Sequence, residues 1–164
     1  MLKAAVIMGS DSDLPVVEKA VNTIRDFGVE TEVHVCSAHR TPEEAREFSL
    51  KARDAGFGVI IAAAGMAAHL AGAIAANTTL PVIGLPLSGG MMDGLDALLS
   101  TVMMPPGVPV ATVGVNGAVN AGLLAVQILS LTDEGLARKL QEYKAEAAEK
   151  VRRKDQAIIE KFKN

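Results

Sequence analysis

An imidazole and a guanidinium lie side by side in the segment SAHRTP at residues 37–42. Histidine can take up and release protons near neutral pH, and arginine can make a two-pronged contact with a phosphate. His39 is also open to a simpler interpretation, as an exposed loop histidine, because histidine is common at protein surfaces. The chemistry that these two residues suggest is binding of a phosphorylated molecule together with proton transfer.

The elements around this segment predict where it lies. Apolar and polar residues alternate over residues 29–36, which indicates a strand. Thr41 is predicted to be the N-cap of a following helix, with Pro42 in its first turn and Glu44 completing a capping box. His39 and Arg40 should then lie in a loop at the carboxyl end of a strand, where open α/β sheets bind their ligands.

A second candidate loop has the sequence MGSDSD at residues 8–13. Gly9 is predicted to permit a tight turn, and the hydroxyl of Ser10 with the N–H groups of a helix start would suit a phosphate. The carboxylate of Asp13 could accept hydrogen bonds from ribose hydroxyls or cap the helix that starts near Pro15. The segment has neither the P-loop lysine nor the G-x-G-x-x-G spacing, which disfavours an ATP or dinucleotide site.

A third loop, AGMAAHLAG at residues 64–72, has small residues that let main chain approach a ligand closely. His69 in this loop is equally consistent with a catalytic role and with a structural one. A fourth loop at residues 88–94, SGGMMDG, is predicted to be mobile and able to close over a site. The histidines lie in separate segments without the spacing of a zinc site, so no metal site is expected.

Short apolar runs that alternate with helical spacing predict an α/β fold. The predicted strands are residues 4–8, 29–36, 59–64, 81–85 and 108–113. One helix is predicted to end at Gly28 and a second to run from Pro42 to about Ala55, before Gly56. Strands that are apolar almost throughout are typical of a parallel sheet covered on both faces. We therefore expect a three-layer, doubly wound, parallel α/β sheet of flavodoxin-like or Rossmann-like order.

The C-terminal third is predicted to be helical. Asn116 can cap a helix over about residues 118–131, and a longer helix is expected over about residues 133–163. That last helix has one apolar stripe on a charged surface and is longer than the sheet needs, so we expect it to pack on a neighbouring subunit. The alternative is a solvated tail beyond about Val151. Residues 1–164 are predicted to form a single domain.

Composition limits the functional classes. Hydrophobic residues make up 49% of the chain and charged residues 21%, with a net charge of −3, which provides no basic field for nucleic acid. No apolar run is long enough for a membrane span and no secretory signal is visible, so a cytoplasmic protein is expected. Cys36, the single cysteine, fits a reducing compartment, and it is more plausibly a small buried hydrophobe than a nucleophile.

Four segments, taken in order, resemble a known family. GSDSD at 9–13, SAHRTP at 37–42, AGMAAHLAG at 64–72 and GLDALLSTVMMPPGVPVATV at 94–113 look like the PurE family, the 5-(carboxyamino)imidazole ribonucleotide mutases of de novo purine synthesis. The resemblance covers essentially the whole chain. It implies a three-layer α/β subunit in a homo-octamer, with active sites at subunit junctions and no cofactor. The implied partner is a small ribonucleotide substrate, with neither nucleic acid nor a membrane.

The resemblance also implies roles for matching positions. His39 matches the family's acid/base histidine. The positions that match substrate-binding residues are Gly9, Ser10, Asp13, Ser37, Ala38, Arg40, Gly65, Ala67, Ala68, His69 and Leu70. The third loop departs from the family's usual GAGGAAHLPG at Met66, where glycine is common, and at Ala71, where proline is common.

Three other functions stay open at this stage. The family's direct carboxylases, which use 5-aminoimidazole ribonucleotide and CO₂, usually lack the AAHL stretch that is present here at residues 67–70. A flavodoxin-like nucleotide- or flavin-binding module without catalysis is disfavoured by the His39-Arg40 pair and by loops without aromatic residues. A purely structural oligomer would have no use for polar, glycine-rich loops at one sheet edge.

Overall fold

A five-stranded parallel sheet forms the centre of the computed structural model, which describes residues 2–163. The strands are β1 (Lys3–Met8), β2 (Thr31–Val35), β3 (Phe57–Gly65), β4 (Val82–Leu87) and β5 (Ala111–Thr112). Their order across the sheet is β2-β1-β3-β4-β5. This is the flavodoxin-like order, and it places the switch in strand order between β1 and β3, where ligands bind in such sheets.

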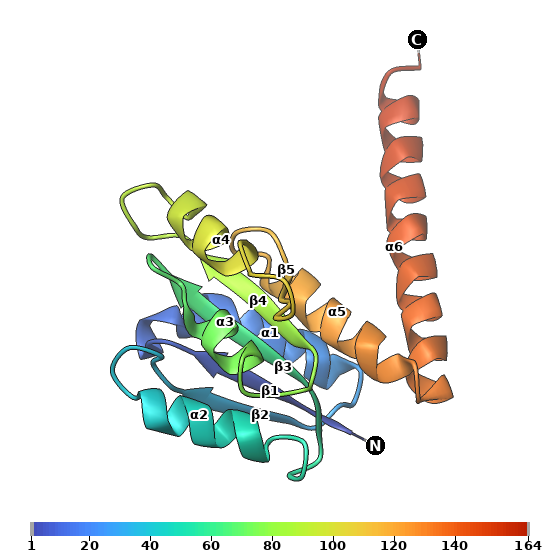
Figure 1. Cartoon of the computed structure of the whole chain (residues 1–164). Helices are drawn as coiled ribbons and strands as arrows, with labels where there is room; N and C mark the ends of the chain where they lie inside the picture. Colours follow the sequence, from blue (N-terminus) through green and yellow to red (C-terminus); the bar gives the residue numbers. More distant parts are fainter. Residues whose placement is uncertain (1, 164) are drawn as a thin grey trace.

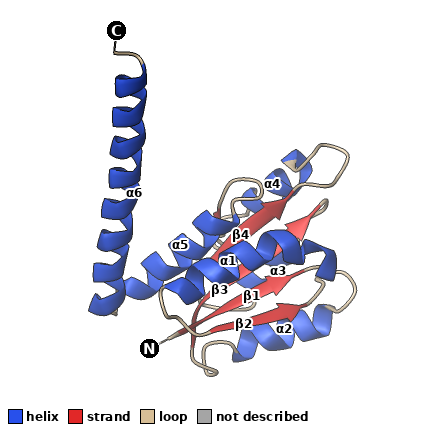
Figure 2. Cartoon of the chain, turned by 180° about the vertical axis from the view of Figure 1, so that it is seen from behind, coloured by secondary structure: helices blue, strands red, loops and turns tan. Residues whose placement is uncertain are grey.

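Helices cover both faces of the sheet, which confirms the predicted three layers. They are the 3₁₀ turn η1 (Asp11–Asp13), α1 (Leu14–Asp26), α2 (Pro42–Lys51), α3 (Leu70–Ala75), α4 (Leu95–Val102), α5 (Ala118–Ser130) and α6 (Glu134–Lys161). Figure 1 shows α2, α3 and α4 in front of the sheet, and the view from behind in Figure 2 shows α1 and α5 on the opposite face.

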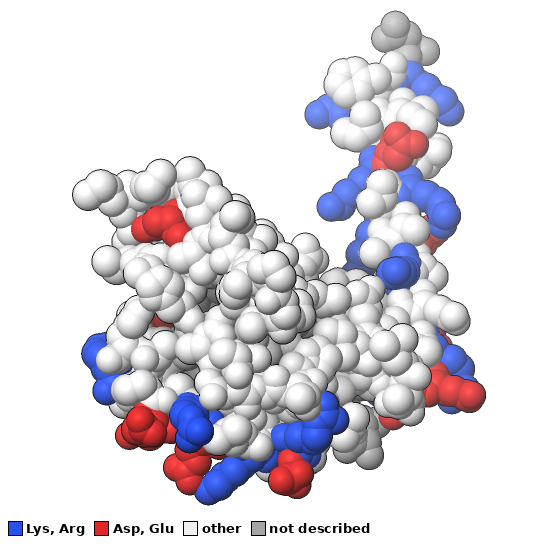
Figure 3. All heavy atoms as spheres, in the orientation of Figure 1, with Lys and Arg blue, Asp and Glu red and all other residues white. Residues whose placement is uncertain are grey.

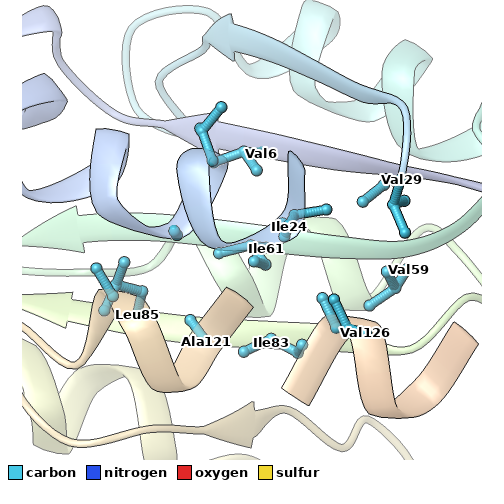
Figure 4. Close-up of a cluster of buried hydrophobic side chains, with 14 of the residues drawn as sticks. Val6, Ile24, Val29, Val59, Ile61, Ile83, Leu85, Ala121 and Val126 are labelled. Atoms are coloured by element: carbon cyan, nitrogen blue, oxygen red, sulfur yellow. The ribbon is translucent and has the colours of Figure 1, made fainter. Parts of the chain in front are cut away.

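Aliphatic side chains fill the space between the layers. Figure 4 shows Val6, Ile61 and Ile83 on three neighbouring strands with Ile24 of α1 and Val126 of α5, all of them fully buried. Burying a side chain of this size contributes about 1.5–3 kcal/mol, and β-branched residues suit strands that are covered on both faces. The sheet is therefore a rigid base for the loops at its edge.

Helices α1 and α5 approach each other closely at Gly122. A Cβ atom at this position would lie 2.9 Å from the main-chain oxygen of Ala20 and 2.9 Å from the Cβ of Thr23. Both distances are shorter than van der Waals contact, so the absence of a side chain at Gly122 sets the spacing of the two helices.

Thr41 is the N-cap residue of α2, as predicted, but its side chain makes no capping hydrogen bond, and the predicted cap of α5 at Asn116 is wrong. The Thr41 hydroxyl does not cap α2 but turns back into the preceding loop, where it accepts from the Ser37 N–H at 2.9 Å and lies 3.1 Å from the Ser37 carbonyl oxygen. Asn116 does not cap α5, whose N-cap is Gly117; its Oδ1 accepts from the Ser88 N–H at 3.0 Å. In both cases a side chain that could cap a helix instead holds a loop at the carboxyl edge of the sheet.

Several element boundaries differ from the predictions. Helix α2 ends at Lys51 and not near Ala55, and β5 has only the two residues Ala111 and Thr112. The short helices α3 and α4 were not predicted. Gly28 lies just beyond the end of α1, and Gly56 ends the turn that follows α2; their φ values of +82° and +87° are ones that glycine adopts without strain.

Helix α6 leaves the body of the molecule, as Figure 1 shows. Its buried residues are Leu136 and Leu140, near its start, where Lys139 donates to the Phe27 carbonyl oxygen at 2.8 Å. Most of the rest of the helix is exposed, and Figure 3 shows charged residues along it. No helix among residues 2–163 is both long enough and apolar enough to cross a bilayer.

Candidate functional site

The loops that follow β1, β2 and β3 meet at one edge of the sheet around a cavity of about 660 Å³. The strands lie side by side in the order β2-β1-β3, so their carboxyl ends bring residues from three parts of the chain together. Of the predicted site residues, the cavity is lined by Gly9, Ser10, Asp13, Ser37, Ala38, His39, Arg40, Gly65, Ala67, His69 and Leu70.

Arg40 connects the loop after β2 with the loop after β1. Its Nη2 donates to the Gly9 carbonyl oxygen at 3.1 Å, and its main-chain N–H donates to the Ser37 hydroxyl at 3.2 Å. The guanidinium remains exposed at the cavity, where its other N–H groups are available to an anion. Gly9 does not have a left-handed φ, so the predicted tight turn is not the reason for this glycine.

The two candidate histidines form a pair. His39 Nε2 lies 2.9 Å from His69 Nδ1, and the rings meet edge to face with their centroids 5.0 Å apart. In such a contact one nitrogen donates and the other accepts, so a single proton lies between the rings. A proton gained or lost by one imidazole therefore changes the hydrogen bond of the other.

The loop after β3 has an unusual main-chain conformation. Met66 adopts a φ of +53°, a conformation that a glycine would adopt freely and that costs a larger residue about 1–2 kcal/mol. Met66 is also one of the sequence's departures from the family pattern, so the loop keeps a glycine-like shape without the glycine. Ala68 is buried and does not line the cavity.

Asp13 at the cavity has a raised pKa. Burial is the largest cause and raises the pKa of its carboxyl above the usual 3.8, and the negative charge of Asp11 acts in the same direction. A hydrogen bond with the Ser10 main chain partly opposes them. The site thus keeps a carboxylate in surroundings that disfavour its charge, which is typical of functional positions.

Other residues line the cavity without having been predicted as site residues: Ser12, Ala64, Met66, Ser88 and Gly89. Ser88 and Gly89 belong to the loop after β4, and Asn116 holds Ser88 through Oδ1 and through Nδ2, which lies 2.8 Å from the Ser88 hydroxyl. The sequence did predict that the loop over residues 88–94 could close over a site, and β4 adjoins β3, so the start of this loop lies at the cavity. Among residues 2–163, no cluster of three or more His, Cys, Asp or Glu could hold a metal ion.

The fold and the site together define a flavodoxin-like α/β protein with a histidine pair and an arginine in a pocket at the strand ends. Residues 3–150 match the family model described as AIR carboxylase. The chain belongs to this family.

Relatives of known function match over most of the chain. The N5-carboxyaminoimidazole ribonucleotide mutase of Methanocaldococcus jannaschii is 52% identical over 96% of this chain and 98% of its own length. The mutase of Thermotoga maritima is 47% identical over 100% of this chain and 98% of its own length. The phosphoribosylaminoimidazole carboxylase of Saccharomyces cerevisiae is 48% identical over 93% of this chain, which corresponds to 27% of that longer protein.

A solved structure supports the fold directly. The crystal structure of Treponema denticola PurE superposes with a TM-score of 0.86 and 30% sequence identity, covering 98% of each chain. A structure with this identity and coverage shows that the two chains share the whole architecture, including the long C-terminal helix.

Proposed function

We propose that the protein converts 5-(carboxyamino)imidazole ribonucleotide to 4-carboxy-5-aminoimidazole ribonucleotide in de novo purine synthesis. The observation that carries this conclusion is the match to mutases at 47% and 52% identity over nearly the entire length of both proteins. The pocket geometry is consistent with it, because an acid/base pair and a cation for phosphate lie in one cavity.

The reaction moves a carboxylate from the exocyclic nitrogen to a ring carbon. In the proposed sequence the N–C bond breaks, CO₂ leaves and the nitrogen gains a proton; the ring carbon then bonds to the CO₂ and loses its own proton. The proton gained in the first half equals the proton lost in the second, so one group can serve both. We assign this role to His39, with His69 as its hydrogen-bond partner.

The remaining cavity residues are assigned to binding. Arg40, Ser10, Ser37 and Asp13 provide charge and hydrogen bonds for the ribose phosphate. The main chain and small side chains of the loops lie against the base and the transferred carboxylate: Gly9, Ala38, Gly65, Ala67, His69 and Leu70. Free CO₂ offers few contacts to hold it, so a small pocket that excludes water should retain it until the ring carbon reacts.

The finer parts of the proposal are an octamer with sites at subunit junctions and a cytoplasmic location. His39, Arg40 and His69 are exposed in the single chain, which leaves room for a neighbouring subunit to cover them. The exposed apolar residues of α6 offer a surface for such contacts. Cys36 is a buried free thiol, as expected in a reducing compartment.

Direct carboxylation of 5-aminoimidazole ribonucleotide is the second candidate function. The observation in its favour is the 48% identity to the yeast carboxylase. A paired assay at neutral pH separates the two, with either the carboxyamino ribonucleotide or the amino ribonucleotide plus low bicarbonate. We expect rapid product formation from the first substrate alone. Efficient use of the second would assign the direct carboxylase, and inactivity toward both would overturn the proposed reaction.

A further inference from the structure

Ser100 lies on α4, outside the three loops that carry the predicted site residues, yet its hydroxyl reaches the loop of His69. Its Oγ accepts from the Ala68 N–H at 2.9 Å. The same hydroxyl can donate to the Asp96 carbonyl oxygen, 2.8 Å away, or to the Met66 carbonyl oxygen at 3.3 Å. Ser100 therefore connects a turn of α4 with the residue that directly precedes His69.

The next residue of α4 approaches the other side of the same peptide segment. The buried Thr101 places its Oγ1 3.4 Å from the Ala68 carbonyl oxygen, while it donates to the Ala97 carbonyl oxygen at 2.7 Å. Ala68 itself is 1% exposed, so its main-chain N–H and carbonyl groups cannot form hydrogen bonds with bulk water. Helix α4 thus reaches both polar groups of Ala68, and the Ser100 contact is the shorter of the two.

The local interactions of the loop after β3 do little to stabilise its conformation. Met66 has an unfavourable positive φ, and α3, which begins after His69, has only six residues and no side-chain hydrogen bond at its N-cap. Such a short helix gains little from its own hydrogen bonds. A contact from outside the loop is therefore needed to fix the position of His69.

We propose that Ser100 is a positioning residue, which holds Ala68 so that the His69 imidazole meets His39 at hydrogen-bond distance. The two nitrogens are 2.9 Å apart, and a displacement of about 1 Å would break the contact. A misplacement of this size costs roughly 100-fold in rate where orientation matters. The effect expected on turnover rests on the proposed function, whereas the effect on the histidine pair does not.

The test compares Ser100→Ala with Ser100→Thr, which keeps a hydroxyl, and with Ser49→Ala as matched control. Ser49 is a buried helix serine whose Oγ donates to the Ala45 carbonyl oxygen at 2.7 Å, four residues earlier, and which does not line the cavity. Two readouts are taken: steady-state kinetics, and ¹⁵N NMR of the histidine ring nitrogens at one fixed pH. His34, on β2, is the internal reference.

Ser100→Ala should lower kcat about 10- to 100-fold with little change in KM, because binding groups elsewhere in the cavity are untouched. The ring signals of His39 and His69 should shift while those of His34 stay in place. Ser100→Thr should restore both properties, and Ser49→Ala should change neither. Unchanged His39 and His69 signals in a folded Ser100→Ala variant would overturn the proposal.

The NMR readout also separates this inference from the proposed reaction. If the wild-type protein shows no turnover, the proposed reaction is wrong. The NMR signals of the histidine rings then test the positioning role of Ser100 by themselves. If Ser100→Ala does not fold, Ser100→Cys takes its place, since sulfur nearly preserves the volume but is a weak acceptor. A shift of the His39 and His69 signals in that variant supports the positioning role, and their constancy contradicts it.

Discussion

His39 and Arg40 are neighbours in the sequence, but their side chains contact different parts of the site. The imidazole of His39 meets His69, whereas the guanidinium of Arg40 bonds to the Gly9 carbonyl oxygen and faces the cavity. The two residues are therefore expected to affect different kinetic constants, although they are adjacent in one loop.

His39→Asn should lower kcat by about 10²- to 10⁴-fold, the usual range for loss of a general acid/base, and leave the fold intact. Arg40→Ala should instead raise KM about 10- to 100-fold, since a hydrogen bond to a charged group contributes about 1.5–3 kcal/mol. Steady-state kinetics on both variants measures the separate effects on kcat and KM. Near-normal kcat in His39→Asn, or an unchanged KM in Arg40→Ala, would contradict the assigned roles.

Asp13 links the site to stability. Because burial raises the pKa of its carboxyl in the folded protein, the folded state holds this proton more tightly than the unfolded chain does. The resulting stabilisation is present below the usual pKa of 3.8 and is lost as the pH rises through the raised value, so at pH 7 the charged carboxylate opposes folding.

Asp13→Asn should therefore raise the melting temperature at pH 7, and this gain should shrink as the pH falls through the raised pKa of Asp13 towards 3.8. The same variant should bind substrate more weakly, because it removes the assigned carboxylate. Thermal unfolding over a pH series, followed by circular dichroism, provides the measurement. A melting temperature at pH 7 that falls in Asp13→Asn would show that the carboxylate stabilises the fold.

At the scale of elements, the contact between α1 and α5 leaves no room for a side chain at Gly122. Gly122→Ala would improve helix propensity by about 1 kcal/mol. The new Cβ would lie 2.9 Å from the main-chain oxygen of Ala20, which cannot move without moving α1, and overpacking of this kind costs about 1–3 kcal/mol.

We therefore expect Gly122→Ala to lower the free energy of unfolding, measured by urea denaturation. Gly114→Ala is the control, because a Cβ at that position meets nothing within 4 Å. Equal stability of the Gly122→Ala variant and the wild type would mean that the two helices can separate without loss.

The sheet could be predicted from the sequence because its strands are apolar almost throughout, and apolar runs between helical segments have one common solution, a covered parallel sheet. The site followed from the same reasoning, since topology alone brings the ends of β1, β2 and β3 together. The pairing of His39 with His69 was not predicted, because it depends on how far two loops bend over β1.

The missed features have a common cause. Thr41 and Asn116 have the side chains of helix caps, but loop contacts compete for the same oxygen atoms, from Ser37 four residues away for Thr41 and from Ser88 in a distant loop for Asn116. Helix α3 is too short to show a period, and Ser100 contacts Ala68 across 32 residues. Local patterns cannot show which of two partners a polar group takes when one of them comes from another part of the chain.

At the scale of the whole molecule, α6 has 28 residues and leaves most of them exposed. Val151, Ile158 and Phe162 are 65%, 56% and 72% exposed, and their spacing of seven and four places them on one side of the helix. Exposed apolar side chains in such a stripe are usually buried against another surface, and we propose that neighbouring subunits provide that surface. That residues 1–164 form a single domain stays a prediction.

The double variant Val151→Glu with Ile158→Glu should reduce the mass of the assembly, measured by light scattering after size exclusion, because two carboxylates would enter an apolar contact. Gln156→Glu adds a charge to the same helix at an exposed position and should leave the mass unchanged. If the double variant keeps the wild-type mass, α6 does not hold the subunits together.

Phe27, near the end of α1, meets Tyr143 of α6 with their ring centroids 5.7 Å apart. The chain has no tryptophan, and Tyr143 is its single tyrosine. When the protein is excited at wavelengths that phenylalanine does not absorb, its fluorescence therefore comes from the Tyr143 ring of α6, which does not line the cavity. Without any label, its emission and anisotropy would report when this helix detaches from the body or joins another subunit.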